Sequence, residues 1–102
     1  MRRRQEGRRD AGWTFVTHHT LVLMCITEDP EIRMVDMAER VGVTERAVLA
    51  IVSDLEDAGY LTRTRVGRRN RYEIDRSMPL RHMETEGHRL GELLAVLAAP
   101  VD

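Results

Sequence analysis

The apolar residues of this chain follow two different periods, which divide it into helical and strand-like segments. Residues 1–12 carry no periodic apolar pattern and are expected to form a polar, flexible arm. The apolar run 21–26 (LVLMCI) fits a buried helix or a buried strand equally well by periodicity alone. Thr17 would be a good N-cap for a helix, and Pro30 disfavours helical geometry just before it, so this element should end near Glu28.

Two short helices are expected next, separated by one glycine. In segment 32–41 the apolar residues recur at i, i+3, i+4 and i+7, which is one stripe of a helix. Gly42 is a typical C-terminal stop and Thr44 a good N-cap, so a second helix is expected over 44–58. Its buried face should consist of Val48, Ile51, Val52 and Leu55. Two helices joined by a glycine turn are typical of a helix-turn-helix.

After these helices the apolar period changes to two, which predicts a β-hairpin. Residues 60–65 and 71–74 alternate between apolar and polar side chains, and turn-forming residues occupy 66–70 between them. We therefore expect a hairpin over 61–74 with a five-residue tip. Segment 87–98 should be a final amphipathic helix, because its leucines lie at i, i+3, i+4 and i+7: Leu90, Leu93, Leu94 and Leu97.

Charge is distributed unevenly along these elements. The 102-residue chain has a formal net charge of −1, yet ten of its sixteen basic residues, all of them arginine, lie in two segments. Residues 61–72 contain five arginines and no acid, and the first ten residues contain five more, Arg2, Arg3, Arg4, Arg8 and Arg9. Arginine presents a planar fork of donors suited to phosphates and guanine edges. The pattern suggests a polyanionic partner for the hairpin. For the arm it leaves two alternatives, which are a contact with the minor groove of DNA and a disordered tail.

The run DMAERVGVTERAVLAIVSDLEDAGYLTRTRVGRRNRYEI (36–74) resembles a family of bacterial transcriptional regulators. The matching features are D-x-A-E-R-x-G-V-T at 36–44, Val48, L-E-x-x-G at 55–59 and the basic hairpin. Together they are similar to the winged helix-turn-helix of MarR-like regulators, with ArsR-like ones as the second choice. The cysteine-pair metal box of many ArsR sensors is absent, so no metal is expected.

The resemblance implies the fold and its organisation. The fold should be mainly α with a small β-hairpin, a winged helix-turn-helix with flanking N- and C-terminal helices, the first of them being the apolar segment at 17–28. Residues 1–12 would be a basic arm, 13–80 the DNA-binding domain and 81–102 a C-terminal dimerisation helix. The helix at 44–58 would be the recognition helix and the hairpin at 61–74 the wing.

Residues on the open face of the recognition helix are the candidates for reading DNA bases. Arg46 could fork onto a guanine edge, and Thr44 could bond a phosphate at the helix N-terminus. Glu45 could accept a hydrogen bond from cytosine, or its negative charge could simply interact favourably with the positive end of the helix dipole. Apolar side chains here can read only thymine methyls or shape. The full set of candidates is Thr44, Glu45, Arg46, Leu49, Ala50 and Ser53.

The wing arginines are the candidates for binding the DNA backbone. Arg68 and Arg69, at the expected tip, suit a narrow minor groove, whereas Arg63, Arg65 and Arg71 suit phosphates. The alternative is a solvated edge whose charges prevent aggregation. Mixed charges would serve that purpose as well, so five arginines without an acid favour a phosphate partner.

The remaining reactive residues suggest no enzyme. Four histidines (His18, His19, His82 and His88) match no strong metal-site spacing, and capping or surface roles are commoner. Cys25 lies inside the apolar run and is expected in the core, with a redox switch as the less favoured alternative. No nucleophile elbow, phosphate loop or carboxylate pair is present.

The expected function is a cytoplasmic, homodimeric, sequence-specific regulator of transcription, acting as a repressor by occlusion on double-stranded DNA. Two-fold symmetry predicts a palindromic operator with half-sites about 34 Å apart. The C-terminal leucine stripe could instead cover its own domain. The main alternative function is a winged-helix module that binds proteins and not DNA. RNA binding is disfavoured because the aromatic residues Trp13, Phe15, Tyr60 and Tyr72 are expected in the core. No cofactor is expected, and any effector would bind between the flanking helices and the domain.

Overall fold

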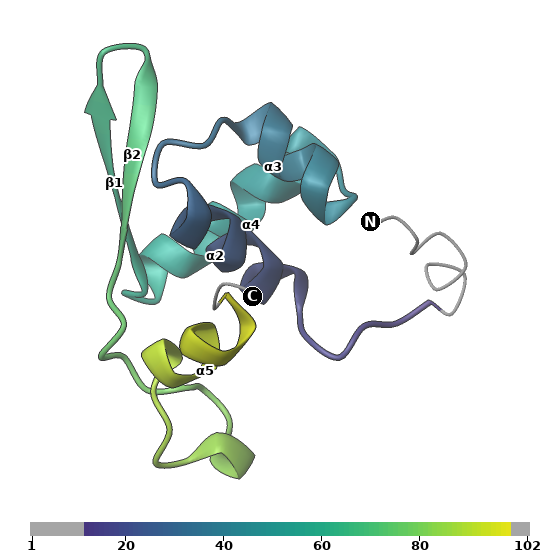
Figure 1. The fold of residues 1–102 in the computed structure, drawn as a ribbon, viewed down its shortest axis with the longest axis vertical. Coiled ribbons are helices and arrows are strands. Elements are labelled where there is room, and N and C mark those ends of the chain that lie inside the picture. Colours follow the sequence, from purple (N-terminus) through teal and green to yellow (C-terminus); the bar gives the residue numbers. More distant parts are fainter. Residues whose placement is uncertain (1–11, 99–102) are drawn as a thin grey trace.

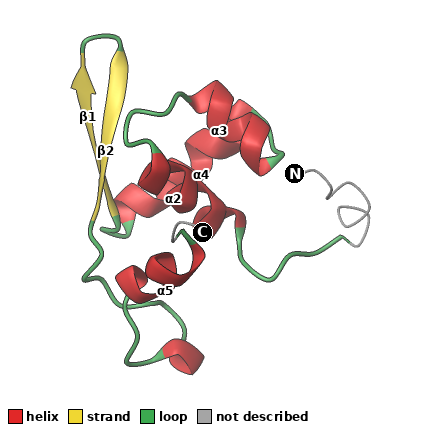
Figure 2. Cartoon of the chain, viewed as in Figure 1, coloured by secondary structure: helices red, strands yellow, loops and turns green. Residues whose placement is uncertain are grey.

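Helices surround a small core in the computed structural model, which describes residues 12–98, and a two-stranded hairpin projects from them (Figures 1 and 2). This is the expected mainly α architecture with a small hairpin. In chain order the elements are α2 (His18–Glu28), α3 (Met34–Val41), α4 (Glu45–Asp57), β1 (Leu61–Val66), β2 (Arg69–Ile74), the 3₁₀ turn η1 (Met83–Thr85) and α5 (Leu90–Leu97). No helix among the described residues is both long and apolar enough to cross a membrane.

The first apolar segment is a helix, as the family resemblance implied. The Thr17 hydroxyl caps α2 by accepting from the Thr20 amide at 3.1 Å. Four of its residues are buried, namely Val22, Leu23, Cys25 and Ile26. The other two residues of the run, Leu21 and Met24, are half-buried. Helix α2 contacts α3, α4, α5 and β2, which explains why its apolar run is not confined to one helical stripe.

The two helices of the helix-turn-helix meet at Gly42. This residue has a φ of 87°, the left-handed conformation that glycine adopts without strain, and its amide donates to the Ala38 carbonyl at 2.9 Å. Thr44 then caps α4 by accepting from the Ala47 amide at 3.0 Å. Helix α3 begins at Met34 and not at 32, because Arg33 is extended and serves as its N-cap.

One hydrophobic core joins the helices to the base of the hairpin. It includes the four residues predicted for the inner face of α4, Val48, Ile51, Val52 and Leu55. Tyr60 and Tyr72 are buried as predicted. The same prediction was wrong for Trp13 and Phe15, whose exposed fractions are 64% and 93%. Both precede α2 in a non-helical segment, and their rings contact each other edge-to-face at 4.9 Å between centroids.

The hairpin is tighter than expected. Strand β1 pairs antiparallel with β2 from Leu61↔Ile74 to Val66↔Arg69, so the turn contains two residues, Gly67 and Arg68. The prediction of a five-residue tip was therefore wrong. Gly67 has a φ of 62°, and no described non-glycine residue has a positive φ, which is the combination of a type II′ turn. This turn matches the twist of the strands, so pairing continues to its edge.

The C-terminal helix α5 packs against α2 and starts at Leu90, three residues later than predicted. The chain reverses before it through a bridge between Pro79 and Arg89. Leu90 and Leu94 are buried in the chain's own core, whereas Leu93 and Leu97 are half-buried. The core thus extends across the boundary expected at residue 80.

Candidate nucleic-acid interface

The outer face of α4 carries the candidate base-reading residues. Its inner face is fixed in the core by the four buried residues named above, so the helix presents the opposite side to solvent. Thr44, Glu45, Arg46, Leu49 and Ala50 are exposed, and Ser53 is half-buried. All six are therefore at least partly open to solvent, although the Thr44 hydroxyl oxygen already accepts the capping hydrogen bond from the Ala47 amide.

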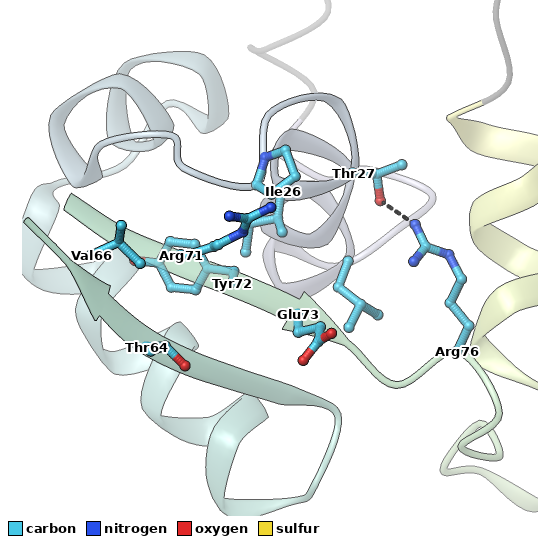
Figure 3. A pocket seen from close by; sticks show the side chains of 10 residues that line it. Ile26, Thr27, Thr64, Val66, Arg71, Tyr72, Glu73 and Arg76 are labelled. Carbon is cyan, nitrogen blue, oxygen red and sulfur yellow. Dashed lines mark hydrogen bonds between the residues drawn. The ribbon is translucent and has the colours of Figure 1, made fainter.

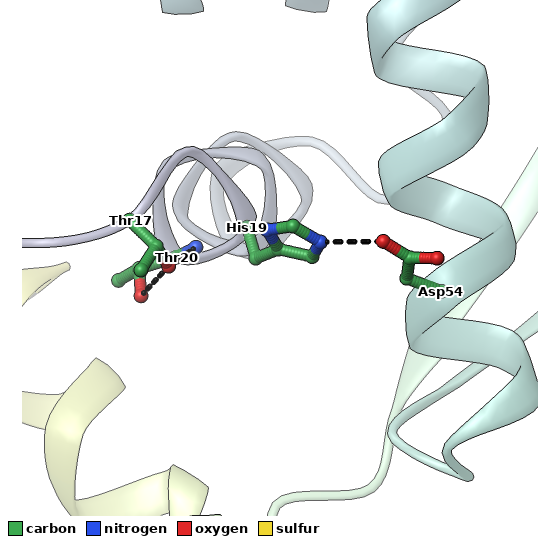
Figure 4. A network of polar contacts seen from close by, with 4 residues as sticks. All are labelled: Thr17, His19, Thr20 and Asp54. Atoms are coloured by element: carbon green, nitrogen blue, oxygen red, sulfur yellow. Dashed lines mark hydrogen bonds and ion pairs between the residues drawn. The ribbon is translucent and has the colours of Figure 1, made fainter.

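Three of the four acidic residues of α4 lie near its C-terminal end, and two of these three are paired. Asp54 Oδ2 is 2.8 Å from His19 Nε2, which links α4 to α2 (Figure 4). Glu56 pairs with Arg63 of the wing. In the N-terminal half of the helix, Glu45 is the only acid and Arg46 the only base. A polyanion approaching that half meets no net negative side-chain charge and the positive end of the helix dipole.

Arg63 is bound to Glu56 by two contacts. Its Nε lies 3.2 Å from Glu56 Oε2, and its Nη2 donates to Oε1 at 3.2 Å. The exposed fractions of the two side chains are only 28% and 27%. A bidentate arginine–carboxylate pair is a strong, directional contact, so this guanidinium is less available to a phosphate than the sequence suggested.

Two further wing arginines contact the loop between α2 and α3. Arg69 Nη1 donates to the Glu31 carbonyl at 3.1 Å, and Arg71 Nη1 lies 3.8 Å from Glu31 Oε2. The Tyr72 amide also donates to the Pro30 carbonyl at 2.8 Å, so this loop runs along β2 and supports it. Arg71 lines a pocket of about 550 Å³ between β2 and the end of α2, where Arg76 bonds Thr27 (Figure 3).

The tip of the wing holds its least engaged charges. Arg65 Nε donates to the Gly67 carbonyl at 3.1 Å, and both Arg65 and Arg68 are exposed. Within residues 12–98, no acid forms an ion pair with Arg65, Arg68 or Arg69. The wing is thus free of acids in sequence from 61 to 72, but the fold brings Glu31 and Glu56 to its base. No sequence motif indicated these two carboxylates, because each comes from another element.

The other candidate residues have ordinary structural partners. His82 Nδ1 accepts from the Glu84 amide at 3.0 Å and caps η1, and His88 Nδ1 lies 2.7 Å from Glu92 Oε1. The bond from His88 lowers the pKa of the Glu92 carboxyl. The part of the chain that the structure describes contains no cluster of three metal-ligating side chains. The arm arginines Arg2, Arg3, Arg4, Arg8 and Arg9 lie outside the described residues.

Comparisons with known proteins agree with this geometry. Residues 19–62, from α2 to the start of the wing, match the family model described as winged helix-turn-helix DNA-binding. Among solved structures, the PcaV transcriptional regulator from Streptomyces coelicolor, in complex with its natural ligand, matches with a TM-score of 0.52 and 23% identity. The match covers 85% of this chain and 63% of that one, so the chain spans less than two thirds of the regulator's length. None of the curated proteins matches in sequence. Residues 19–62 therefore match a winged helix-turn-helix, and the described chain has the same fold as the PcaV regulator.

Proposed function

We propose that this protein is a sequence-specific, double-stranded-DNA-binding regulator of transcription that represses by occluding its operator. The observation that carries the proposal is the combination of an open α4 face with a wing tip whose arginines form no ion pair among the described residues. A module that bound only proteins would gain nothing from these free charges. DNA would contact both the wing tip and the open α4 face, since contacts to its backbone give affinity and contacts to its bases give specificity.

Each group has a distinct role in this proposal. Arg46 forks onto a guanine edge in the major groove, and Thr44 donates to a phosphate beside the α4 N-terminus. Arg65, Arg68 and Arg69 hold the backbone or enter the minor groove. Arg63 and Arg71 contribute to the field of the wing, but each would have to share its carboxylate partner to contact a phosphate directly.

Selection of bound sequences from a random DNA pool tests this proposal. We expect one enriched motif, and we expect Arg46→Ala to relax the preference at one base pair, at a cost of about 1–3 kcal/mol. Arg81→Ala is the matched control, because Arg81 is exposed and lies between β2 and η1, outside both α4 and the wing. Failure to enrich any sequence, with no affinity for DNA at low salt, would favour the protein-binding alternative.

A homodimer is the second part of the proposal. Leu90 and Leu94 are already buried in their own subunit, so a partner would contact the outer side of α5 through Leu93, Leu97 and the exposed Val96. The exposed Trp13 offers further apolar surface. The dimer would bind a palindromic operator. Val96→Glu should convert the dimer to a monomer, as measured by light scattering. Ala95→Glu, one residue away on the same helix, places the same charge next to that position and provides the comparison. A wild-type protein that is monomeric at all concentrations would exclude this interface.

A small-molecule effector is the third part, and a specific cavity supports it. A cavity of about 720 Å³ lies between α2, the end of α4 and the segment leading into α5, lined by side chains such as Leu23, Leu55 and Tyr60 with His19 and Arg81. The similar regulator PcaV was solved with its natural ligand. A compound that raises the melting temperature and weakens DNA binding would support an effector site here. Ala58→Trp, which fills the cavity, should abolish both effects.

A further inference from the structure

The middle of the exposed α4 face is apolar. Leu49 is 47% exposed, and Ala50 beside it is exposed as well. Arg46 lies one turn before Leu49, and Ser53 one turn after it. The face therefore offers hydrogen-bonding side chains at its two ends and none between them.

This arrangement sets which feature of a base pair the middle of the helix can detect. From Arg46 to Ser53 the helix rises about 10.5 Å, close to the length of three base pairs at ~3.4 Å each. The base-pair edges in the major groove present donors, acceptors and one apolar group, which is the 5-methyl of thymine. An apolar side chain gains most from that methyl, because it can match none of the polar groups.

Exposed leucines are common, so exposure alone would carry little weight. Leu49, however, lies on the one face of α4 that the core leaves open, between two polar candidates for base contact, and α4 leads directly into the hairpin that carries the free charges. DNA drawn to those charges would cover Leu49 and remove its water. Val35, exposed to nearly the same extent at 45%, lies on α3 and lacks this setting.

We propose that Leu49, with Ala50, makes α4 a reader of 5-methylpyrimidines, so that each half-site carries thymine one or two base pairs from the guanine that Arg46 contacts. The inference rests on the proposed DNA-binding function and specifies the base class that it selects. Burying one methyl group corresponds to about a fourfold gain in affinity.

Replacing thymine by deoxyuridine tests the inference, because it removes only the methyl group. In the operator selected above, each dT is replaced singly by dU and the Kd is measured by fluorescence anisotropy. We expect one or two positions per half-site to lose about three- to fivefold in affinity. In Leu49→Ala, replacing dT by dU at those positions should no longer lower the affinity. Val35→Ala, the matched control, should keep it.

A second arm uses cytosine at the sensitive position. An operator with a C·G pair there should be bound more weakly. Replacing that dC by 5-methyl-dC should raise the affinity of the wild-type protein about threefold and leave the affinity of Leu49→Ala unchanged. Equal affinity for dT and dU at every position would overturn the inference, as would a dU effect that persists unchanged in Leu49→Ala. Either result leaves the proposed function standing, since the operator is still bound. If no sequence is bound at all, the proposed function fails and this inference fails with it.

Discussion

Two carboxylates, Glu31 and Glu56, form ion pairs with some of the wing arginines and leave the others without an acidic partner among the described residues. Glu56 holds Arg63 by two contacts at 3.2 Å, whereas Arg68 at the turn forms no ion pair within residues 12–98. The two arginines are alike in sequence but differ in what a substitution would remove. One change should affect mainly stability, and the other mainly DNA affinity.

Arg68→Ala should weaken binding to all DNA sequences and reduce the magnitude of the log–log salt slope by about one per subunit. Arg63→Ala should leave the slope nearly unchanged and lower the free energy of unfolding by about 1 kcal/mol, because the half-buried Glu56 loses its partner. Anisotropy over a salt series and urea unfolding measure the two effects. Glu56→Gln is the reciprocal variant, and it should release Arg63 and steepen the slope. A slope change in Arg63→Ala as large as that in Arg68→Ala would show that Arg63 also binds a phosphate.

Cys25 gives a second prediction for a single residue. Burial raises the pKa of its thiol, and the nearby positive charge of Arg40 opposes the shift only partly. The folded state thus holds the proton more tightly than the unfolded chain, which has the ordinary value of 9.0. Stability is complete below that value and falls as pH rises through it. Urea unfolding at pH 7.5 and 9.5 should show this decline, and Cys25→Ala should reduce it. Rapid alkylation of the native protein at pH 7.5 would contradict a buried, protonated thiol.

Among the elements, the turn between α3 and α4 is the one that fixes where α4 begins. Gly42→Ala should lower the free energy of unfolding by about 1 kcal/mol, because φ of 87° strains any residue with a Cβ. A Cβ there would meet no neighbouring atom within 4 Å, so the cost would come from the backbone alone. Thermal unfolding measures it, with Ala95→Gly as a helix-interior control of similar size. An unchanged melting temperature in Gly42→Ala would exclude backbone strain at this turn.

Local signals explain which elements the sequence could predict. The caps at Thr17 and Thr44 and the stripe inside α4 depend on near neighbours, and the structure places all three as expected. The hairpin was predicted but its turn was not, because Val66 and Asn70 read as turn residues although both are paired across the strands. Whether 21–26 was helix or strand could not be decided from periodicity, since all six residues are apolar and α2 contacts several other elements.

Contacts between distant elements could not be predicted in the same way. The pairing of Arg63 with Glu56 depends on how β1 leaves α4, and no periodicity encodes it. The exposure of Trp13 was missed because aromatic composition alone does not say whether a segment packs. The leucine stripe of α5 was recognised, but only the fold shows that Leu90 and Leu94 cover α5's own domain.

At the scale of the whole molecule, an almost neutral chain carries a locally basic wing tip. With a formal net charge of −1, the protein as a whole should have little attraction for polyanions, so the proposed DNA binding would depend on the local charge of the wing tip and the α4 N-terminus. If a dimer neutralises about six to eight phosphates, each releases condensed counterions, and affinity must fall steeply with salt.

The central claim, that DNA is held by these charges, is tested most directly by the salt dependence of binding to the selected operator. Anisotropy between 50 and 300 mM salt should give a log–log slope of about −5 to −7 for the wild-type protein if it binds as the proposed dimer. The variant Arg65→Ala/Arg68→Ala should bind every sequence more weakly with a shallower slope, and Arg81→Ala should match wild type. Affinity that does not change with salt, or a slope unaffected by loss of the two tip arginines, would contradict the account.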